Sequence, residues 1–281
     1  MDKERMIELL NKDIEDEHGA IIQYLMHAYS MGEGEVACEI EAIARDEMRH
    51  LDWLAEMVVA LGGVPSLERG TMNMAGASVP EWMTNDVGLE DGAIAQYREH
   101  IAAIDDPKVK RLLQRILSDE LYHRGDFEHF VEKTDREGLT DIRGDRSDRT
   151  TQNMNRGIEH EYTVILQYLL QSYLTPNAEA SEELEDQAIN EMQHLGWLAE
   201  ELAGMGGNPV IEHTEVDRST ATADMLRVDI DIENQVADAY DRAAGETEDT
   251  DLKELFQRMR DHERYHAEVF GDLLREEEKS G

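Results

Sequence analysis

Apolar residues recur at intervals of three and four along most of the chain, which is the periodicity of amphipathic helices. Proline is scarce and runs of β-branched residues are few, so the predicted fold class is all-α. Glycine, proline and polar clusters interrupt the pattern and indicate where helices end. The expected helices span residues 2–31, 35–61, 87–104, 107–133, 151–174, 178–203, 223–244 and 249–275.

Two longer segments break the helical pattern. Residues 65–86 are rich in glycine, serine, asparagine and methionine, and we expect them to form a long connection between the second and third helices. Residues 135–150 have almost no apolar content and predict a domain linker. The linker would separate two domains, residues 1–134 and 151–281, each long enough to bury its own core.

The second half of the sequence repeats the first. Residues 50–56, HLDWLAE, resemble residues 194–200, HLGWLAE. Residues 17–24 resemble residues 90–97 in the same half and residues 161–168 in the other half. The sequence therefore predicts a tandem duplication in which each half is built from two similar helix pairs.

A Glu-x-x-His pair occurs four times at one fixed distance from a single preceding glutamate. In the first copy, Glu17 lies 30 residues before Glu47, His50 completes the pair, and Tyr24 follows Glu17 after seven residues. The twelve candidate metal ligands of the four copies are Glu17, Glu47, His50, Glu90, Glu120, His123, Glu161, Glu191, His194, Glu233, Glu263 and His266. The four tyrosines are Tyr24, Tyr97, Tyr168 and Tyr240.

This spacing suits a pair of metal ions. Residues three apart share one face of a helix, so Glu-x-x-His directs a carboxylate and an imidazole the same way. Two such helices, with two more that each contribute one glutamate, can surround two cations, as in di-iron and di-manganese four-helix bundles. These ligands suit iron or manganese better than softer metals. One Glu-x-x-His is expected by chance in so acidic a chain, but four copies at one spacing are not. We therefore predict one di-metal site in each half, with each tyrosine hydrogen-bonded to a ligand carboxylate.

The motifs resemble those of the ferritin-like superfamily, in particular bacterioferritin and the erythrin part of rubrerythrin. The segment from Asp46 to His50, followed by an apolar helix and Gly-Gly-Val-Pro65, is similar to the second helix of bacterioferritin and its exit. The resemblance implies two tandem ferritin-like four-helix bundles that bind ferrous iron and oxidise it with O₂ or peroxide at di-iron centres. It also implies that the bridging ligands are Glu47, Glu120, Glu191 and Glu263.

Two methionines resemble a haem site of the same family. Met48 occupies the position of the haem-binding methionine of bacterioferritin, and Met192 matches it in the second half. Thioether ligation of haem is chemically sound, so the resemblance implies a haem held by these residues. The alternative is that both methionines only fill a helix interface.

The residue before each motif glutamate differs between the halves. It is Asp46 and Asp119 in the first half, but Asn190 and His262 in the second. In the family this acid often hydrogen-bonds the ligand histidine of the opposite motif, which fixes the tautomer and raises the basicity of the imidazole. Asparagine is neutral, and histidine competes for metal or carries positive charge. We therefore expect the second site to bind iron more weakly.

The charge of the chain limits the classes of partner that it can bind. Acidic residues number 64 against 27 basic ones, a formal charge of −37, which would repel nucleic acid and anionic membranes. The acidic residues are spread along the chain and are not gathered in a tail. This distribution favours adaptation to the high-salt cytoplasm of a halophile over an acidic surface that only aids solubility. The single cysteine, Cys38, excludes an internal disulfide and a Cys-x-x-Cys metal site, so any electron donor is external. Without a signal peptide or a run of ~20 apolar residues, we expect a soluble cytoplasmic protein.

Several functions share these features. The leading hypothesis is a ferroxidase or peroxidase-type oxidoreductase that acts in iron homeostasis or peroxide detoxification. Peroxide disproportionation, as in manganese catalase, is a chemical rival, since the same ligands suit manganese. Iron storage or carriage, and metals that only brace the bundles, are further alternatives. The sequence leaves open whether the chain forms a homo-oligomer.

Overall fold

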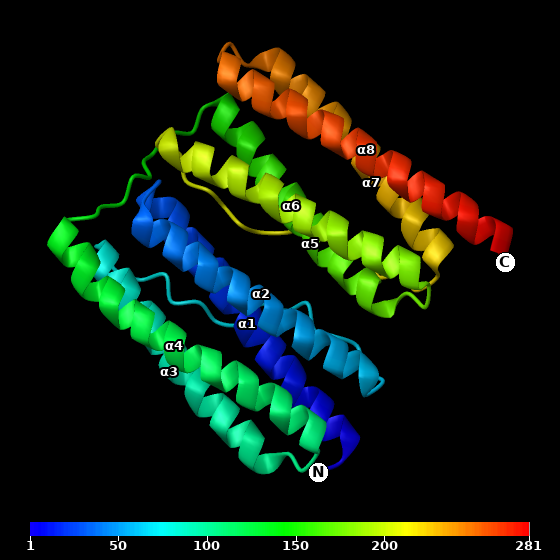
Figure 1. Ribbon diagram of the computed structural model, residues 1–281. Helices are drawn as coiled ribbons and strands as arrows, with labels where there is room; N and C mark the ends of the chain where they lie inside the picture. Colours follow the sequence, from blue (N-terminus) through cyan, green and yellow to red (C-terminus); the bar gives the residue numbers. More distant parts are fainter. Residues whose placement is uncertain (281) are drawn as a thin grey trace. The chain divides into compact units, whose positions relative to one another are not determined.

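The computed structural model describes residues 1–280, and within them it contains eight α-helices and no β-strand (Figure 1). The predicted all-α class is confirmed. Among these residues, none of the helices combines the length and the apolar character needed to span a bilayer. The expected end of the second domain, Gly281, lies outside the described residues. The helices are α1 Lys3–Met31, α2 Glu35–Ala60, α3 Val79–Ala103, α4 Pro107–Glu137, α5 Arg149–Leu174, α6 Ala178–Gly204, α7 Thr222–Glu246 and α8 Thr250–Ser280.

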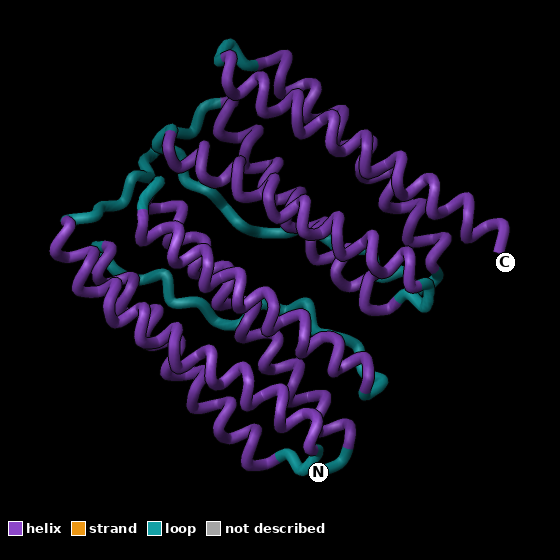
Figure 2. The backbone as a smooth tube through the Cα atoms, in the orientation of Figure 1, coloured by secondary structure: helices purple, strands orange, loops and turns teal. Residues whose placement is uncertain are grey.

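The chain divides into two compact units, Met1–Arg143 and Gly144–Gly281. In the first unit α1 pairs with α2 and α3 with α4, and the two pairs meet through α1 against α3 and α2 against α4 (Figures 1 and 2). The second unit repeats this with α5 to α8. Helix α4 continues to Glu137, so the first part of the segment expected to be a linker is helical. Ile142 N then donates to Ser30 O at 2.9 Å, which fastens the end of the unit to α1.

Helix α3 begins at Val79, so the expected start at Val87 was wrong. Pro80 lies in its first turn, where the missing N–H removes no helical hydrogen bond. Trp82 and Met83 follow and are buried, so packing stabilises a turn that polar and glycine-rich neighbours conceal in the sequence.

The connection between α2 and α3 runs along α1 and covers it. Ser66 N donates to Asn11 Oδ1 at 2.9 Å, and Asn73 N donates to Gln23 Oε1 at 2.6 Å. The backbones approach closely at Gly70, whose N–H donates to Glu15 O at 2.6 Å, and at Gly19, where a Cβ would lie 3.1 Å from the carbonyl oxygen of Gly70. Because this connection covers the side of α1 that is turned away from the other helices, α1 is buried on every side from residue 17 to residue 25. The middle of α1 is thereby shielded from water.

Aromatic side chains fill the core beside the motif tyrosines. Tyr24 packs against Phe127 with ring centroids 4.6 Å apart, and both rings are fully buried. In the second unit Tyr168 meets Phe270 edge to face at 5.2 Å. Packing on one side leaves each tyrosine little rotational freedom, so its hydroxyl is held in a fixed direction.

Candidate metal centres

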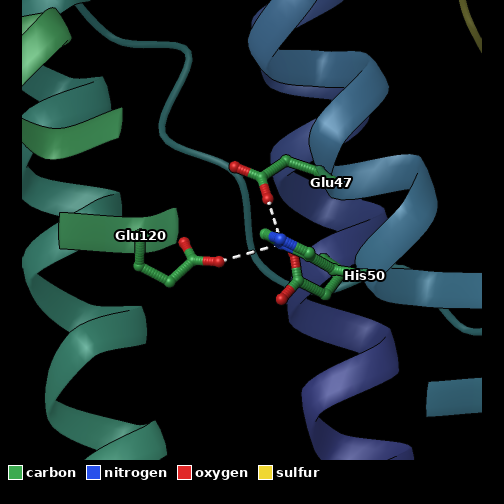
Figure 3. Close-up of side chains that lie close together, drawn as sticks. Glu47, His50 and Glu120 are labelled. Carbon is green, nitrogen blue, oxygen red and sulfur yellow. Dashed lines mark ion pairs between the residues drawn. The ribbon is translucent and has the colours of Figure 1, made fainter. Parts of the chain in front are cut away.

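The first unit brings its six predicted ligands together in the middle of the helices. One group contains Glu17, Glu47, His50 and Glu120, and a second contains Glu47, Glu90, Glu120 and His123. In each group one ligand atom per residue lies within 4.8 Å of the others, and every member is buried. Glu47 and Glu120 belong to both groups, so they lie between two positions at which a cation could be held. Figure 3 shows Glu47 and His50 from α2 directed towards Glu120 of α4.

The second unit repeats the arrangement. Its two groups share Glu191 and Glu263, which correspond to the shared pair of the first unit. The remaining members are Glu161, His194, Glu233 and His266. All twelve predicted ligand residues are therefore gathered in two buried clusters.

The polar atoms of the first cluster converge without satisfying one another. His50 Nδ1 lies 2.7 Å from Glu47 Oε2 and 3.0 Å from Glu120 Oε1, and His123 Nδ1 lies 2.9 Å from Glu47 Oε1. Yet both Nδ1 atoms and both Glu47 oxygens lack a hydrogen-bond partner. Unpartnered polar atoms in a protein interior are costly. A pair of cations at the point of convergence would satisfy them together, so the residues fit a di-metal centre.

The pKa values of the cluster residues also indicate that positive charge belongs at these sites. Burial, together with repulsion from Glu47 and Glu17, raises the pKa of Glu120. In the second unit burial and the neighbouring Glu263 raise the pKa of Glu233 to about 8. Burial disfavours the charged form of His266, but contact with the surrounding glutamates raises its pKa to about 12. Four close carboxylates ionise together only beside positive charge, which protonated histidines or bound cations can supply.

The four tyrosines bond the ligand glutamates crosswise. Tyr24 of α1 donates to Glu90 Oε1 of α3 at 2.5 Å, and Tyr97 of α3 donates to Glu17 of α1. In the second unit Tyr168 donates to Glu233 and Tyr240 to Glu161. Each tyrosine thus holds a carboxylate on the partner helix, not the one seven residues before it. These bonds orient the glutamates that belong to only one group of their cluster, and they tie the two helix pairs together.

The Nε2 atoms of the candidate ligand histidines, on the far side of the ring from Nδ1, have different neighbours in the two units. In the first, His50 Nε2 lies 3.5 Å from Asp119 Oδ2, and His123 Nε2 lies 3.4 Å from Asp46 Oδ2. The aspartate before each motif therefore lies beside the histidine of the opposite motif, as expected.

In the second unit the equivalent neighbours have changed. His194 Nε2 lies 2.9 Å from His262 Nδ1. Asn190 donates its amide to Gln187 Oε1 at 3.2 Å. The asymmetry expected from the sequence is therefore present in the side-chain contacts.

Sequence reasoning missed two buried histidine–aspartate pairs in the first unit. His27 Nδ1 lies 2.9 Å from Asp86 Oδ2, and His100 Nδ1 lies 2.8 Å from Asp13 Oδ1. Each aspartate comes four residues before a ligand glutamate, and each histidine three residues after a motif tyrosine. The same spacing occurs on α1 and on α3, so comparing these helices over a longer stretch would have singled out the four residues, although not which of them pair.

Met48 and Met192 are half-buried on α2 and α6, and each follows directly after a glutamate that both groups of its cluster share. They belong to different units. Haem binding by these methionines stays a prediction.

Comparison with known proteins places these features in a family. The model of the ferritin-like domain matches residues 7–137 and again residues 151–280. The bacterioferritin of Desulfovibrio desulfuricans is 35% identical over 127 residues, which cover 43% of this chain and 71% of the relative. The bacterioferritin of Streptomyces coelicolor is 33% identical over 124 residues, covering 42% and 74%.

A solved structure gives a similar alignment. The X-ray structure of the D. desulfuricans bacterioferritin, which describes its diiron site in different catalytic states, aligns with a TM-score of 0.46 and 33% identity. The alignment covers 48% of this chain and 82% of that chain. Because the family model matches both halves, the predicted duplication is confirmed, and the chain belongs to the ferritin-like family and carries its domain twice.

Proposed function

We propose that this protein binds iron at two di-metal centres and oxidises ferrous iron with O₂ or peroxide, as a ferroxidase acting in iron homeostasis and peroxide detoxification. The observation that carries the proposal is the pair of buried clusters, each made of two four-residue groups that share two glutamates. The sequence similarity to bacterioferritins supports iron as the metal.

The ligand set defines what each residue would do. Glu47 and Glu120 would bridge the two metal positions, as would Glu191 and Glu263 in the second unit. When bound, a di-iron centre supplies the one-electron changes through which ferrous iron is oxidised. Four ionised glutamates balance the charge of two divalent cations, so a ferrous pair leaves no net charge buried. The crosswise tyrosines hold the terminal carboxylates, and the buried setting of the ligands limits access of water.

The donor set also supports a second candidate. Carboxylate-rich sites also bind manganese, so a di-manganese centre that disproportionates peroxide rests on the same geometry. The two candidates differ in the metal that co-purifies and in the oxidant consumed. Iron storage predicts a further result, which is a particle of many chains with a mineral core.

The experiment removes one bridging pair at a time. We expect anaerobically purified protein to bind two ferrous ions per cluster, and Glu47→Ala with Glu120→Ala to abolish binding in the first unit alone. Glu191→Ala with Glu263→Ala should do the same in the second, and the fourfold variant should bind none. Stopped-flow oxidation, measured with O₂ and with peroxide separately, reports the activity of each unit.

The control is Glu56→Ala, which removes an exposed carboxylate from the same helix α2. It should leave both metal content and oxidation rate unchanged. A fourfold variant that oxidises ferrous iron as fast as the native protein would refute the proposal. Manganese in place of iron, with peroxide consumed and O₂ released, would favour the second candidate.

A further inference from the structure

The two units keep the same twelve ligands but surround them with different charges. In the first unit each ligand histidine has a carboxylate behind it, Asp119 beside His50 and Asp46 beside His123. Arg115 and Arg49 pair with these aspartates, but their side chains are 66% and 60% exposed, so solvent screens their charge. The aspartates are less exposed than the arginines, at 26% and 35%, and each lies against its buried histidine.

The second unit has no carboxylate at either of these two positions. His194 contacts the imidazole of His262, and the residue in the place of Asp46 is Asn190, whose amide is engaged by Gln187. When His194 Nδ1 faces a metal, its Nε2–H donates to His262 Nδ1. The acceptor is then a neutral ring, and the ligand gains none of the anionic character that a carboxylate partner confers.

A second difference lies on the α1–α3 side. The first unit has Asp86 paired with His27 and Asp13 paired with His100, all four buried. These carboxylates stand one helical turn from the ligands Glu90 and Glu17 on the same helices.

The corresponding positions of the second unit keep one of these two carboxylates and neither of the two histidines. Gly157 and Ala243 stand in the places of Asp13 and His100. Asp229 remains in the place of Asp86, but its partners are the neutral amides of Gln167 and Gln171. Three of the four outer carboxylates around the first cluster are therefore absent from the second, and no acidic residue replaces them at those positions.

This difference acts on the oxidation state of bound iron. Each iron that passes from the ferrous to the ferric state gives up one electron and gains one positive charge, so a di-iron centre gains two. Nearby carboxylates in a buried setting favour the more positive state. The four glutamates balance only a ferrous pair, so negatively charged groups behind them stabilise the ferric pair.

We propose that the two centres have different oxidation-state preferences: the first unit stabilises the ferric pair, and the second unit, through Asn190 and His262, stabilises the ferrous pair. The proposal rests on the proposed function, because it takes iron as the metal. The two centres then act in sequence during reduction. The second accepts electrons from an external one-electron donor at a potential at which the first stays ferric.

The test is an equilibrium redox titration of iron-loaded protein with mediators. Glu191→Ala with Glu263→Ala isolates the first centre, and Glu47→Ala with Glu120→Ala isolates the second. Electron paramagnetic resonance of the mixed-valence state at each potential gives the midpoint. We expect the midpoint of the second centre to lie above that of the first.

Reciprocal exchange of the outer residues identifies the cause. Asn190→Asp with His262→Asp should lower the potential of the second centre, and Asp46→Asn with Asp119→His should raise that of the first. Changes to outer partners of metal ligands commonly alter metal affinity tenfold to a hundredfold, and we expect the redox equilibrium to change by a similar factor. This corresponds to roughly 60 to 120 mV for a one-electron step. Gln193→Asp adds a carboxylate to the exposed face of α6 and is the control; it should shift the potential far less.

The outcomes are separable. Absence of iron from both single-centre proteins would overturn the proposed function and this inference with it. Two iron-loaded centres with equal midpoints would overturn the inference alone, as would reciprocal exchanges that leave both midpoints in place while iron stays bound. The exchanges run in opposite directions, so a variant that fails to fold in one unit leaves the other exchange decisive.

Discussion

Asp229 of α7 is a buried carboxyl whose replacement by asparagine should change how the stability of the second unit depends on pH. Its Oδ1 accepts hydrogen bonds from Gln167 at 2.7 Å and Gln171 at 3.2 Å, but its Oδ2 has no partner. Burial raises the pKa of Asp229 from 3.8 to about 8, against the lowering effect of the two amides. Asparagine has nearly the same shape and does not ionise, so Asp229→Asn isolates this one titration.

The size of the effect follows from linkage. Between the unfolded value of 3.8 and the folded value of about 8, the folded state keeps a proton that the unfolded state has lost. Stability therefore falls as pH rises through this window, by about 1.4 kcal/mol per pH unit. From pH 5 to pH 7 the native protein should lose about 2.7 kcal/mol relative to Asp229→Asn. A domain of this size changes its melting temperature by about 3 °C per kcal/mol. Between pH 5 and pH 7 the melting temperature of the native protein should therefore fall by roughly 8 °C relative to that of Asp229→Asn.

The assay is thermal and urea unfolding of the metal-free native protein and of the variant at pH 5, 6 and 7. Asp86→Asn is the matched control in the first unit. Asp86 accepts from both His27 and Gln23, so this change should destabilise the protein at pH 7, by about 1–3 kcal/mol for the partner left unsatisfied. Equal pH slopes for the native protein and Asp229→Asn would refute the reasoning, because they would mean that Asp229 ionises alike in both states.

Two further predictions concern the packing of the sites. Tyr97→Phe removes the hydroxyl that holds Glu17 and should weaken ferrous-iron binding in the first unit by about tenfold. The affinity is measured by anaerobic competition with a chromophoric chelator in the Glu191→Ala, Glu263→Ala background, and unchanged affinity would show that the bond does not orient the carboxylate. Gly157→Ala would place a Cβ 2.7 Å from Leu198 Cδ1 and should cost about 1–3 kcal/mol in urea unfolding. The control Gly125→Ala, with no atom within 4 Å, should instead stabilise α4 by about 0.5–1 kcal/mol, and equal effects of the two would contradict the packing argument.

The residues that gather in the two clusters could be predicted from the sequence because two periodicities coincide in them. A spacing of three fixes a shared helix face, and the separation of 30 residues between Glu17 and Glu47 occurs four times in the chain. Neither observation requires knowledge of how the helices pack. The start of α3 at Val79 could not be predicted in the same way, since the burial of Trp82 depends on residues distant in the sequence.

The contacts between helices were still harder to predict from the sequence. That Tyr24 bonds Glu90 and not Glu17 depends on the register of α1 against α3, which no local pattern sets. The pairing of His27 with Asp86 depends on the same register. The sequence gives the residues of such pairs, whereas the packing of the helix pairs decides which residues meet.

The candidate ligands of the two units match in type and position, whereas the residues around them differ. Ligand positions tolerate little change, because the loss of one shared glutamate, such as Glu47, would remove a donor from both cation positions. The residues behind them can change without dismantling the cluster. Asp46 and Asn190 occupy equivalent places, yet only the first brings a negative charge towards an opposing imidazole. Because the chain carries both versions, each unit serves as the reference for the other, and differences between the centres can be assigned to these outer residues within one protein.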